Sequence, residues 1–125
     1  MKRDFSLIIE DDQDLATIFS EALQAAEYET EIIQDGRLAL ERLADTQPAV
    51  VVLDLHLPQI SGKKVLDQIR SAKHLAATRV ILATADPFMA ESLREIADLV
   101  LIKPISFGQL RDLAARLRPP DVVGQ

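Results

Sequence analysis

The sequence predicts an α/β domain in which a five-stranded parallel sheet is covered by helices on both faces. Short apolar segments alternate five times with segments whose apolar residues recur at helical spacing. The segment from Ala49 to Leu53 is apolar at every position, as expected for a central strand that is buried on both faces. A chain of 125 residues is long enough for one such domain with a single core.

The first two strand and helix units occupy the region before Pro48. Residues 5–9 are apolar apart from one serine, and either Asp12 or Asp14 can cap the helix that follows. Residues 28–33 alternate only weakly between apolar and polar, which is typical of an edge strand. Asp35-Gly36 interrupts this pattern, and the second helix stops before Pro48. The first helix has apolar residues at Leu15, Ile18, Phe19, Ala22 and Ala26, and the second at Leu40, Leu43 and Ala44.

Three further units follow, each with a helix start signal. Ser61 is a candidate N-cap after the turn at 58–62, and Asp86 with Pro87 begins the helix after the strand at 79–84. The strand at 99–102 leads to a last helix whose start, 106–109, has capping-box spacing. Pro119-Pro120 ends that helix. The residues expected to face inward are Val65, Leu66, Ile69 and Ala72, then Met89, Leu93 and Ile96, and finally Leu110, Leu113, Ala114 and Leu117.

Composition and charge narrow the classes of function. The 20 acidic and 14 basic residues give a net charge of −6, which argues against direct binding to nucleic acid or to an anionic membrane. The chain has no cysteine, so disulfides and thiolate chemistry are excluded. The apolar run near the start, Leu7-Ile8-Ile9, is too short for a signal peptide or a membrane span. We therefore expect a cytoplasmic protein with a protein partner or a metal ligand.

Polar residues collect where the predicted strands end. Right-handed crossovers bring the carboxyl ends of parallel strands to one edge of the sheet, where sites are built. Converging carboxylates repel one another unless they share a proton or bind a hard cation, and oxygen ligands favour Mg²⁺. The residues expected at this edge are Glu10, Asp11, Asp12, Asp54, Thr84 and Lys103.

This set of residues favours phosphate chemistry. A carboxylate beside Mg²⁺ can attack phosphorus to form an acyl phosphate, and Asp54 is the candidate nucleophile. Lys103 would supply a cation for a phosphoryl oxygen, and Thr84 a hydroxyl donor. Each residue also has a purely structural interpretation: Asp54 can cap a turn, Thr84 can end a strand, and acids suit a helix N-terminus. Their occurrence together at one end of successive strands favours the functional interpretation.

The motifs and their order resemble the receiver domain of two-component response regulators, over the whole chain except its last few residues. The resemblance implies a doubly wound (βα)5 sheet of flavodoxin-like type with strand order 2-1-3-4-5. It also implies a receiver domain at residues 1–118, followed by a C-terminal tail or linker stub at 119–125. The motifs are Leu7-Ile8-Ile9-Glu10-Asp11-Asp12, Asp35-Gly36, Val52-Leu53-Asp54-Leu55 with Pro58 and Gly62, Ile81 to Ala85, and Lys103-Pro104.

The resemblance also assigns roles to site residues. Glu10 and Asp11 match the acidic pair that binds Mg²⁺ together with Asp54, and the backbone carbonyl of His56 would complete the protein ligands. Asp54 matches the aspartate that accepts a phosphoryl group from a histidine kinase or a phosphotransfer protein. Thr84 and Lys103 match the hydroxyl and the lysine that contact this group, and the bond from Lys103 to proline is cis in the family.

Such a domain assists its own phosphorylation and dephosphorylation and turns over no external substrate. By the same resemblance, phosphorylation would switch the binding of a downstream effector or output domain, and a phosphorylation-dependent dimer is one form that such a switch can take.

The sequence departs from the receiver pattern at two places. Receivers usually have Tyr or Phe three residues before the lysine, where this chain has Val100. His56 and Asp86 lie two residues after Asp54 and Thr84, respectively. We hypothesise that His56 and Asp86 pair across the mouth of the site and shield an acyl phosphate from water.

Three other functions compete with this interpretation. A receiver-like docking domain that is independent of phosphorylation is supported by Val100 and opposed by the intact acidic set. A Mg²⁺-dependent phosphatase with an aspartyl nucleophile would need a second aspartate where His56 stands. A nucleotide-binding module of flavodoxin-like or Rossmann type would need a glycine-rich loop after the first strand, where the chain has Glu10-Asp11-Asp12.

Overall fold

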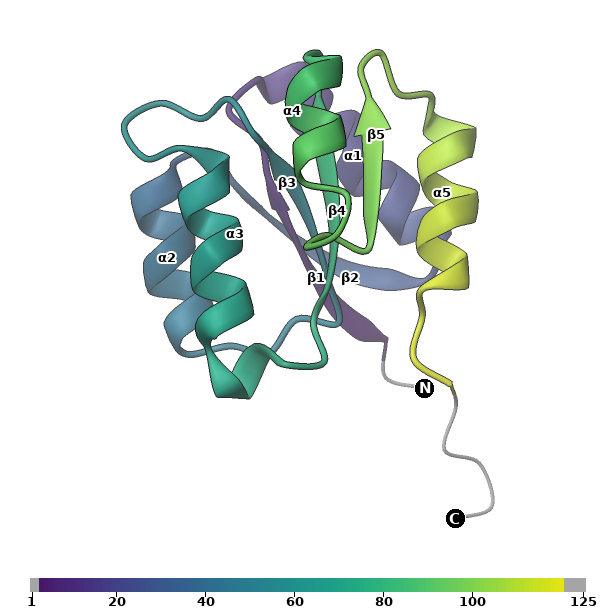
Figure 1. The fold of residues 1–125 in the computed structure, drawn as a ribbon. Coiled ribbons are helices and arrows are strands. Elements are labelled where there is room, and N and C mark those ends of the chain that lie inside the picture. Colours follow the sequence, from purple (N-terminus) through teal and green to yellow (C-terminus); the bar gives the residue numbers. More distant parts are fainter. Residues whose placement is uncertain (1–2, 121–125) are drawn as a thin grey trace.

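A computed structural model describes residues 3–120 of the chain. Its five strands form one parallel sheet in the order β2-β1-β3-β4-β5, which confirms the predicted sheet and the strand order implied by the resemblance (Figure 1). β2 is an edge strand, as its weak alternation predicted. The strands are β1 (Asp4–Ile9), β2 (Tyr28–Ile33), β3 (Val50–Asp54), β4 (Arg79–Thr84) and β5 (Leu99–Ile102).

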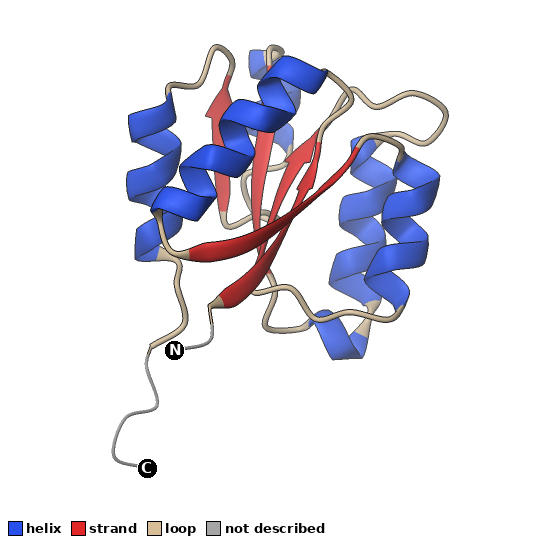
Figure 2. Cartoon of the chain, turned by 180° about the vertical axis from the view of Figure 1, so that it is seen from behind, coloured by secondary structure: helices blue, strands red, loops and turns tan. Residues whose placement is uncertain are grey.

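Helices cover both faces of this sheet (Figures 1 and 2). α1 and α5 pack against each other on one face, and α2 and α3 pack against each other on the opposite face. Each face has its own cluster of buried apolar side chains, so the sheet lies between two halves of the core. The helices are α1 (Gln13–Ala25), α2 (Gly36–Ala44), α3 (Gly62–Ser71), α4 (Pro87–Ser92) and α5 (Phe107–Arg116), with a 3₁₀ turn η1 (Lys73–Leu75).

The predicted helix starts are confirmed by side-chain hydrogen bonds. The carboxylate of Asp12 accepts from the Leu15 amide and so caps α1, which decides between Asp12 and Asp14. Ser61, Asp86 and Ser106 cap α3, α4 and α5 in the same way. These caps fix where each helix leaves the carboxyl edge of the sheet.

Three predicted core positions are wrong. Ala44, the last residue of α2, is exposed, whereas Leu43 is buried. Ile96 is 38% exposed because α4 ends at Ser92, so that helical spacing no longer applies beyond Leu93. Ile18 is 40% exposed, since α1 buries only the stripe that faces the sheet and α5.

The chain after α5 was expected to form a tail. Pro119 and Pro120 belong to no helix or strand, and the rest of that tail, 121–125, lies outside the described residues. Of the helices in residues 3–120, none has the length and apolar character needed to cross a membrane.

Candidate functional site

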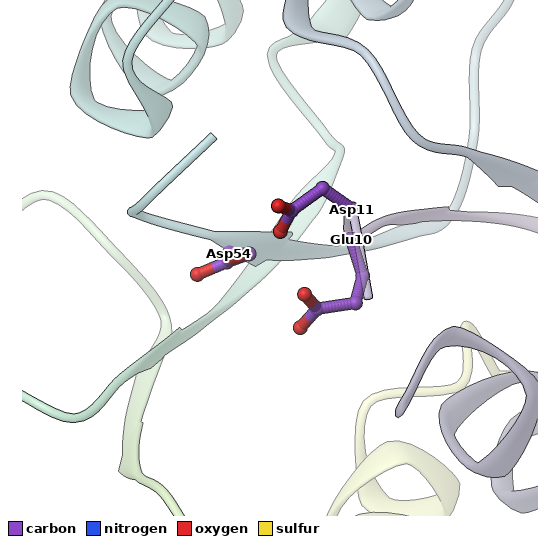
Figure 3. A group of neighbouring side chains, drawn as sticks. All are labelled: Glu10, Asp11 and Asp54. Carbon is purple, nitrogen blue, oxygen red and sulfur yellow. The ribbon is translucent and has the colours of Figure 1, made fainter. Parts of the chain in front are cut away.

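Three carboxylates converge at the carboxyl edge of the sheet. Glu10 and Asp11 follow β1, and Asp54 is the last residue of the neighbouring strand β3. Each offers one oxygen atom, and these three atoms all lie within 4.8 Å of one another (Figure 3). Glu10 and Asp54 are only 1% and 3% exposed, whereas Asp11 is exposed. Parallel pairing of β1 with β3 therefore brings together acids that are 43 or 44 positions apart in the sequence.

Lys103 supplies the cation of the site. Its Nζ atom donates to Oε1 of Glu10 at 3.0 Å and lies 3.5 Å from Oδ1 of Asp54. The Lys103 amide donates to the Thr84 carbonyl, and the peptide bond to Pro104 is cis. Three carboxylates and one ammonium leave an excess of two negative charges when all four groups are ionised.

Burial changes the ionisation of this cluster. Loss of solvent at Glu10, reinforced by the charge of Asp54 and opposed by the Lys103 hydrogen bond, raises the pKa of Glu10 to about 7. Burial lowers the pKa of Lys103, but the hydrogen bond to Glu10 and the charges of Asp54 and Glu10 outweigh this and raise it. Lys103 is therefore a permanent cation, while burial disfavours the charged form of Glu10.

The donor set suits a hard divalent cation. All three side chains of the cluster offer carboxylate oxygens, and neither imidazole nitrogen nor sulfur belongs to it. A divalent ion would match the excess of two negative charges. The carboxylates of Glu10, Asp11 and Asp54 are thus the residues that could hold Mg²⁺, while the role of the His56 carbonyl as a further ligand stays a prediction.

The hydroxyl of Thr84 lies at the end of β4 and is fully buried. Its Oγ1 atom accepts from the Asp86 amide at 3.0 Å and lies 3.3 Å from Nε2 of His56. The hypothesis that His56 pairs with Asp86 is wrong, because no hydrogen bond or ion pair joins these two residues within the described part of the chain. The Asp86 carboxylate accepts from the amides of Phe88 and Met89 as the cap of α4. His56 contacts the Thr84 hydroxyl instead, and its own amide donates to Oδ1 of Asp54 at 3.0 Å.

Gly62, at the start of α3, packs closely against the backbone of Asp54 and Leu55. A Cβ atom at Gly62 would lie 2.3 Å from the carbonyl oxygen of Asp54, and the Gly62 amide donates to the Leu55 carbonyl. The sequence motif includes Gly62, but its positioning role was not predicted. A glycine in the first turn of a helix directly after a site-bearing strand is the signal that could have found it.

The comparisons with known proteins agree with this geometry. The model of the response regulator receiver domain family matches residues 6–115. The chain is 34% identical over 113 residues to the regulatory protein AtoC of Escherichia coli, covering 88% of this chain and 24% of that protein. It is 31% identical over 126 residues to the response regulator MprA of Mycolicibacterium vanbaalenii, covering 95% of this chain and 54% of that protein.

A solved structure shows the same fold. The signal receiver domain of a signal transduction histidine kinase from Syntrophus aciditrophicus superposes with a TM-score of 0.80 at 29% identity, covering 91% of this chain and 89% of that one. The chain therefore belongs to the response regulator receiver family.

Receiver domains are signalling modules of two-component systems rather than enzymes that turn over a substrate, and they interact with histidine kinases and with output domains. The chain spans about a quarter to a half of the length of the curated relatives named above.

Proposed function

We propose that the chain accepts a phosphoryl group on Asp54 from a histidine kinase or phosphotransfer protein, in a reaction that depends on Mg²⁺. The observation that carries this proposal is the convergence of Glu10, Asp11 and Asp54 within 4.8 Å, with Lys103 in contact with two of them. The phosphorylated chain then changes its affinity for a downstream effector or output domain. The assignments of Glu10, Asp11, Asp54, His56, Thr84 and Lys103 are part of this proposal.

In the proposed reaction a carboxylate oxygen of Asp54 attacks the phosphorus atom of a phosphohistidine. The P–N bond breaks, and the departing imidazole takes up a proton. The bound metal would neutralise part of the charge on the phosphoryl oxygens. The His56 amide donates to Oδ1 of Asp54 and so holds the carboxylate in place. The ammonium group of Lys103, which now lies beside Asp54, would pair with an oxygen of the phosphoryl group once that group is attached to Asp54.

Thr84 would then donate its hydroxyl to the phosphoryl group. Strand β4 is paired with β3, and Asp54 lies opposite Ala83, the residue before Thr84. A movement of Thr84 would reach the start of α4 through the Asp86 amide. Val100 is aliphatic and half-buried against the core, so we propose a switch that works through Thr84 and α4 without an aromatic rotamer in β5.

Further parts of the proposal concern the whole protein. We propose that residues 1–118 form the receiver and that 119–125 are a tail or linker stub. The cytoplasmic location and a phosphorylation-dependent dimer stay predictions.

Intact-mass analysis after incubation with acetyl phosphate tests the proposal. We expect one phosphoryl adduct on the wild type with Mg²⁺, and none with EDTA or on Asp54→Asn. Asp12→Asn is the matched control, because Asp12 is next to the cluster but caps α1, a role that Asn fills equally well; it should be phosphorylated normally. A wild type that forms no adduct under any condition would favour the phosphorylation-independent docking domain. An adduct that persists on Asp54→Asn would refute the assignment of Asp54.

A further inference from the structure

The buried hydroxyl of Thr84 has a side-chain partner at the surface. Its Oγ1 atom lies 3.3 Å from Nε2 of the exposed His56 and accepts the Asp86 amide at 3.0 Å. Within residues 3–120 no hydrogen bond joins Thr84 to Asp54, and His56 is the only side chain that forms a hydrogen bond with the hydroxyl. The imidazole therefore holds the hydroxyl in the unphosphorylated protein.

We propose that His56 is a positioning residue, a resting-state latch that competes with the phosphoryl group for the hydroxyl of Thr84. The inference rests on the proposed function, in which this hydroxyl donates to a phosphoryl group on Asp54. The His56 ring and the Asp86 amide both hydrogen-bond to Oγ1 of Thr84, so a rotation of this oxygen toward Asp54 breaks both hydrogen bonds. Either imidazole tautomer holds it, because Nε2 can accept the hydroxyl proton or donate to the oxygen.

The latch has a clear direction of effect. When the hydroxyl turns away, the exposed imidazole can hydrogen-bond to water, so the His56 side chain opposes the switch by only one modest hydrogen bond, in addition to the bond from the Asp86 amide. Removing the imidazole should therefore favour the phosphorylated arrangement by about two- to tenfold, the equilibrium equivalent of one such bond. The Asp86 amide and the His56 amide are backbone groups and persist in every variant at position 56.

The first test observes the contact in the metal-free, unphosphorylated protein. Long-range ¹H–¹⁵N NMR reports the tautomer and chemical shifts of the ring nitrogens, and the chain has only two histidines, so His74→Ala assigns both rings. We expect Thr84→Val to change the Nε2 shift of His56 and leave His74 unchanged, while Thr84→Ser retains the wild-type shift. Identical His56 signals in the wild type and Thr84→Val would overturn the latch.

The second test measures the competition. Beryllofluoride with Mg²⁺ mimics an acyl phosphate on aspartate, and its affinity can be measured by isothermal titration calorimetry. We expect His56→Ala to bind it about two- to tenfold more tightly, and His56→Gln, whose amide can reach Oγ1, to bind it like the wild type. The control His74→Ala should have wild-type affinity, since its ring contacts the Leu43 carbonyl away from the site.

A double-mutant cycle separates the latch from other effects of the substitution. In the Thr84→Val background, His56→Ala should leave the affinity for beryllofluoride unchanged, because there is no hydroxyl left to hold. An equal gain in both backgrounds, or no gain in either, would overturn the latch alone. A wild type that does not bind the probe at all would overturn the proposed function as well.

Discussion

Gly62→Ala tests whether the start of α3 sets the position of Asp54. The added Cβ would lie 2.3 Å from the Asp54 carbonyl oxygen and 2.6 Å from the Leu55 Cα, whereas ordinary contact begins at 3.4 Å. The two segments must therefore separate by about 1 Å, the difference between 3.4 and 2.3 Å. Overpacking of this kind costs about 1–3 kcal/mol, and the smaller entropy of the unfolded alanine chain offsets about 0.4–1 kcal/mol. We expect a net loss of about 1–2 kcal/mol.

Urea denaturation and thermal unfolding measure this loss, which corresponds to a Tm lower by about 4–8 °C. A displacement of about 1 Å at Asp54 should also slow phosphorylation by acetyl phosphate, by up to about a hundredfold. Gly108→Ala is the matched control, because its Cβ would meet only the Arg111 side chain at 3.7 Å. It should be as stable as the wild type or more so by up to about 1 kcal/mol. Equal stability and rate for Gly62→Ala and the wild type would refute the reasoning.

Three further predictions concern charged groups. Lys103→Met removes a cation that lies 3.0 Å from Glu10 and 3.5 Å from Asp54, so Mg²⁺ affinity measured by calorimetry should rise severalfold while phosphorylation slows; a weaker Mg²⁺ affinity would contradict this. Glu10 has a pKa of about 7 in the folded protein, above the ordinary glutamate value of 4.5, so the folded protein holds an extra proton between these pH values. In EDTA its unfolding free energy should therefore fall from pH 5 to pH 7, and Glu10→Gln should lose this component of the slope. Asp98→Ala should lower the unfolding free energy in urea by about 1–3 kcal/mol, because it deprives the Val80 amide and two arginines of their acceptor. The control for Asp98→Ala is Glu91→Ala, because Glu91 forms an exposed ion pair with Arg94. This substitution should change the unfolding free energy by less than about 0.5 kcal/mol.

The contacts of Asp98 also determine how its contribution to stability changes with pH. Burial raises the pKa of Asp98, but the Val80 amide and Arg70 outweigh this and lower it below its usual value. An acid whose folded pKa is lowered stabilises the protein above its unfolded pKa, and this contribution is lost as the pH falls through the folded pKa. The difference in stability between the wild type and Asp98→Ala should therefore shrink in acid, and a constant difference would contradict it.

Local sequence patterns predicted most of the fold. The apolar run that forms β3 and the helix caps Ser61 and Asp86 depend on residues within a few positions of one another, so spacing alone predicts them. For α1, spacing limited the cap to Asp12 or Asp14, and the structure identifies Asp12. The edge position of β2 followed from its weaker alternation. The convergence of Glu10, Asp11 and Asp54 then followed from the rule that parallel strands end at one edge.

The remaining features depend on contacts between distant parts of the chain. The hydrogen bond from Lys103 to Glu10 joins residues 93 positions apart. Local spacing therefore cannot predict that Lys103 lies nearer to Glu10 than to Asp54. Asp98 looks like a loop acid in the sequence, yet Arg70 and Arg79 reach it from elsewhere in the fold. His56 was expected to pair with an opposite charge, but the N-cap of α4 engages Asp86.

The site of covalent modification tests the central claim most directly. After incubation with acetyl phosphate and Mg²⁺, borohydride reduction converts an aspartyl phosphate into homoserine, and tryptic peptides can then be sequenced by mass spectrometry. Cleavage after Arg42 and Lys63 places Asp54 on the peptide 43–63, whereas Glu10 and Asp11 lie on the peptide 4–37. We predict homoserine at position 54 and no change on peptide 4–37. Modification of another residue, or none with full Mg²⁺ present, would contradict the assignment of Asp54 as the phosphoryl acceptor.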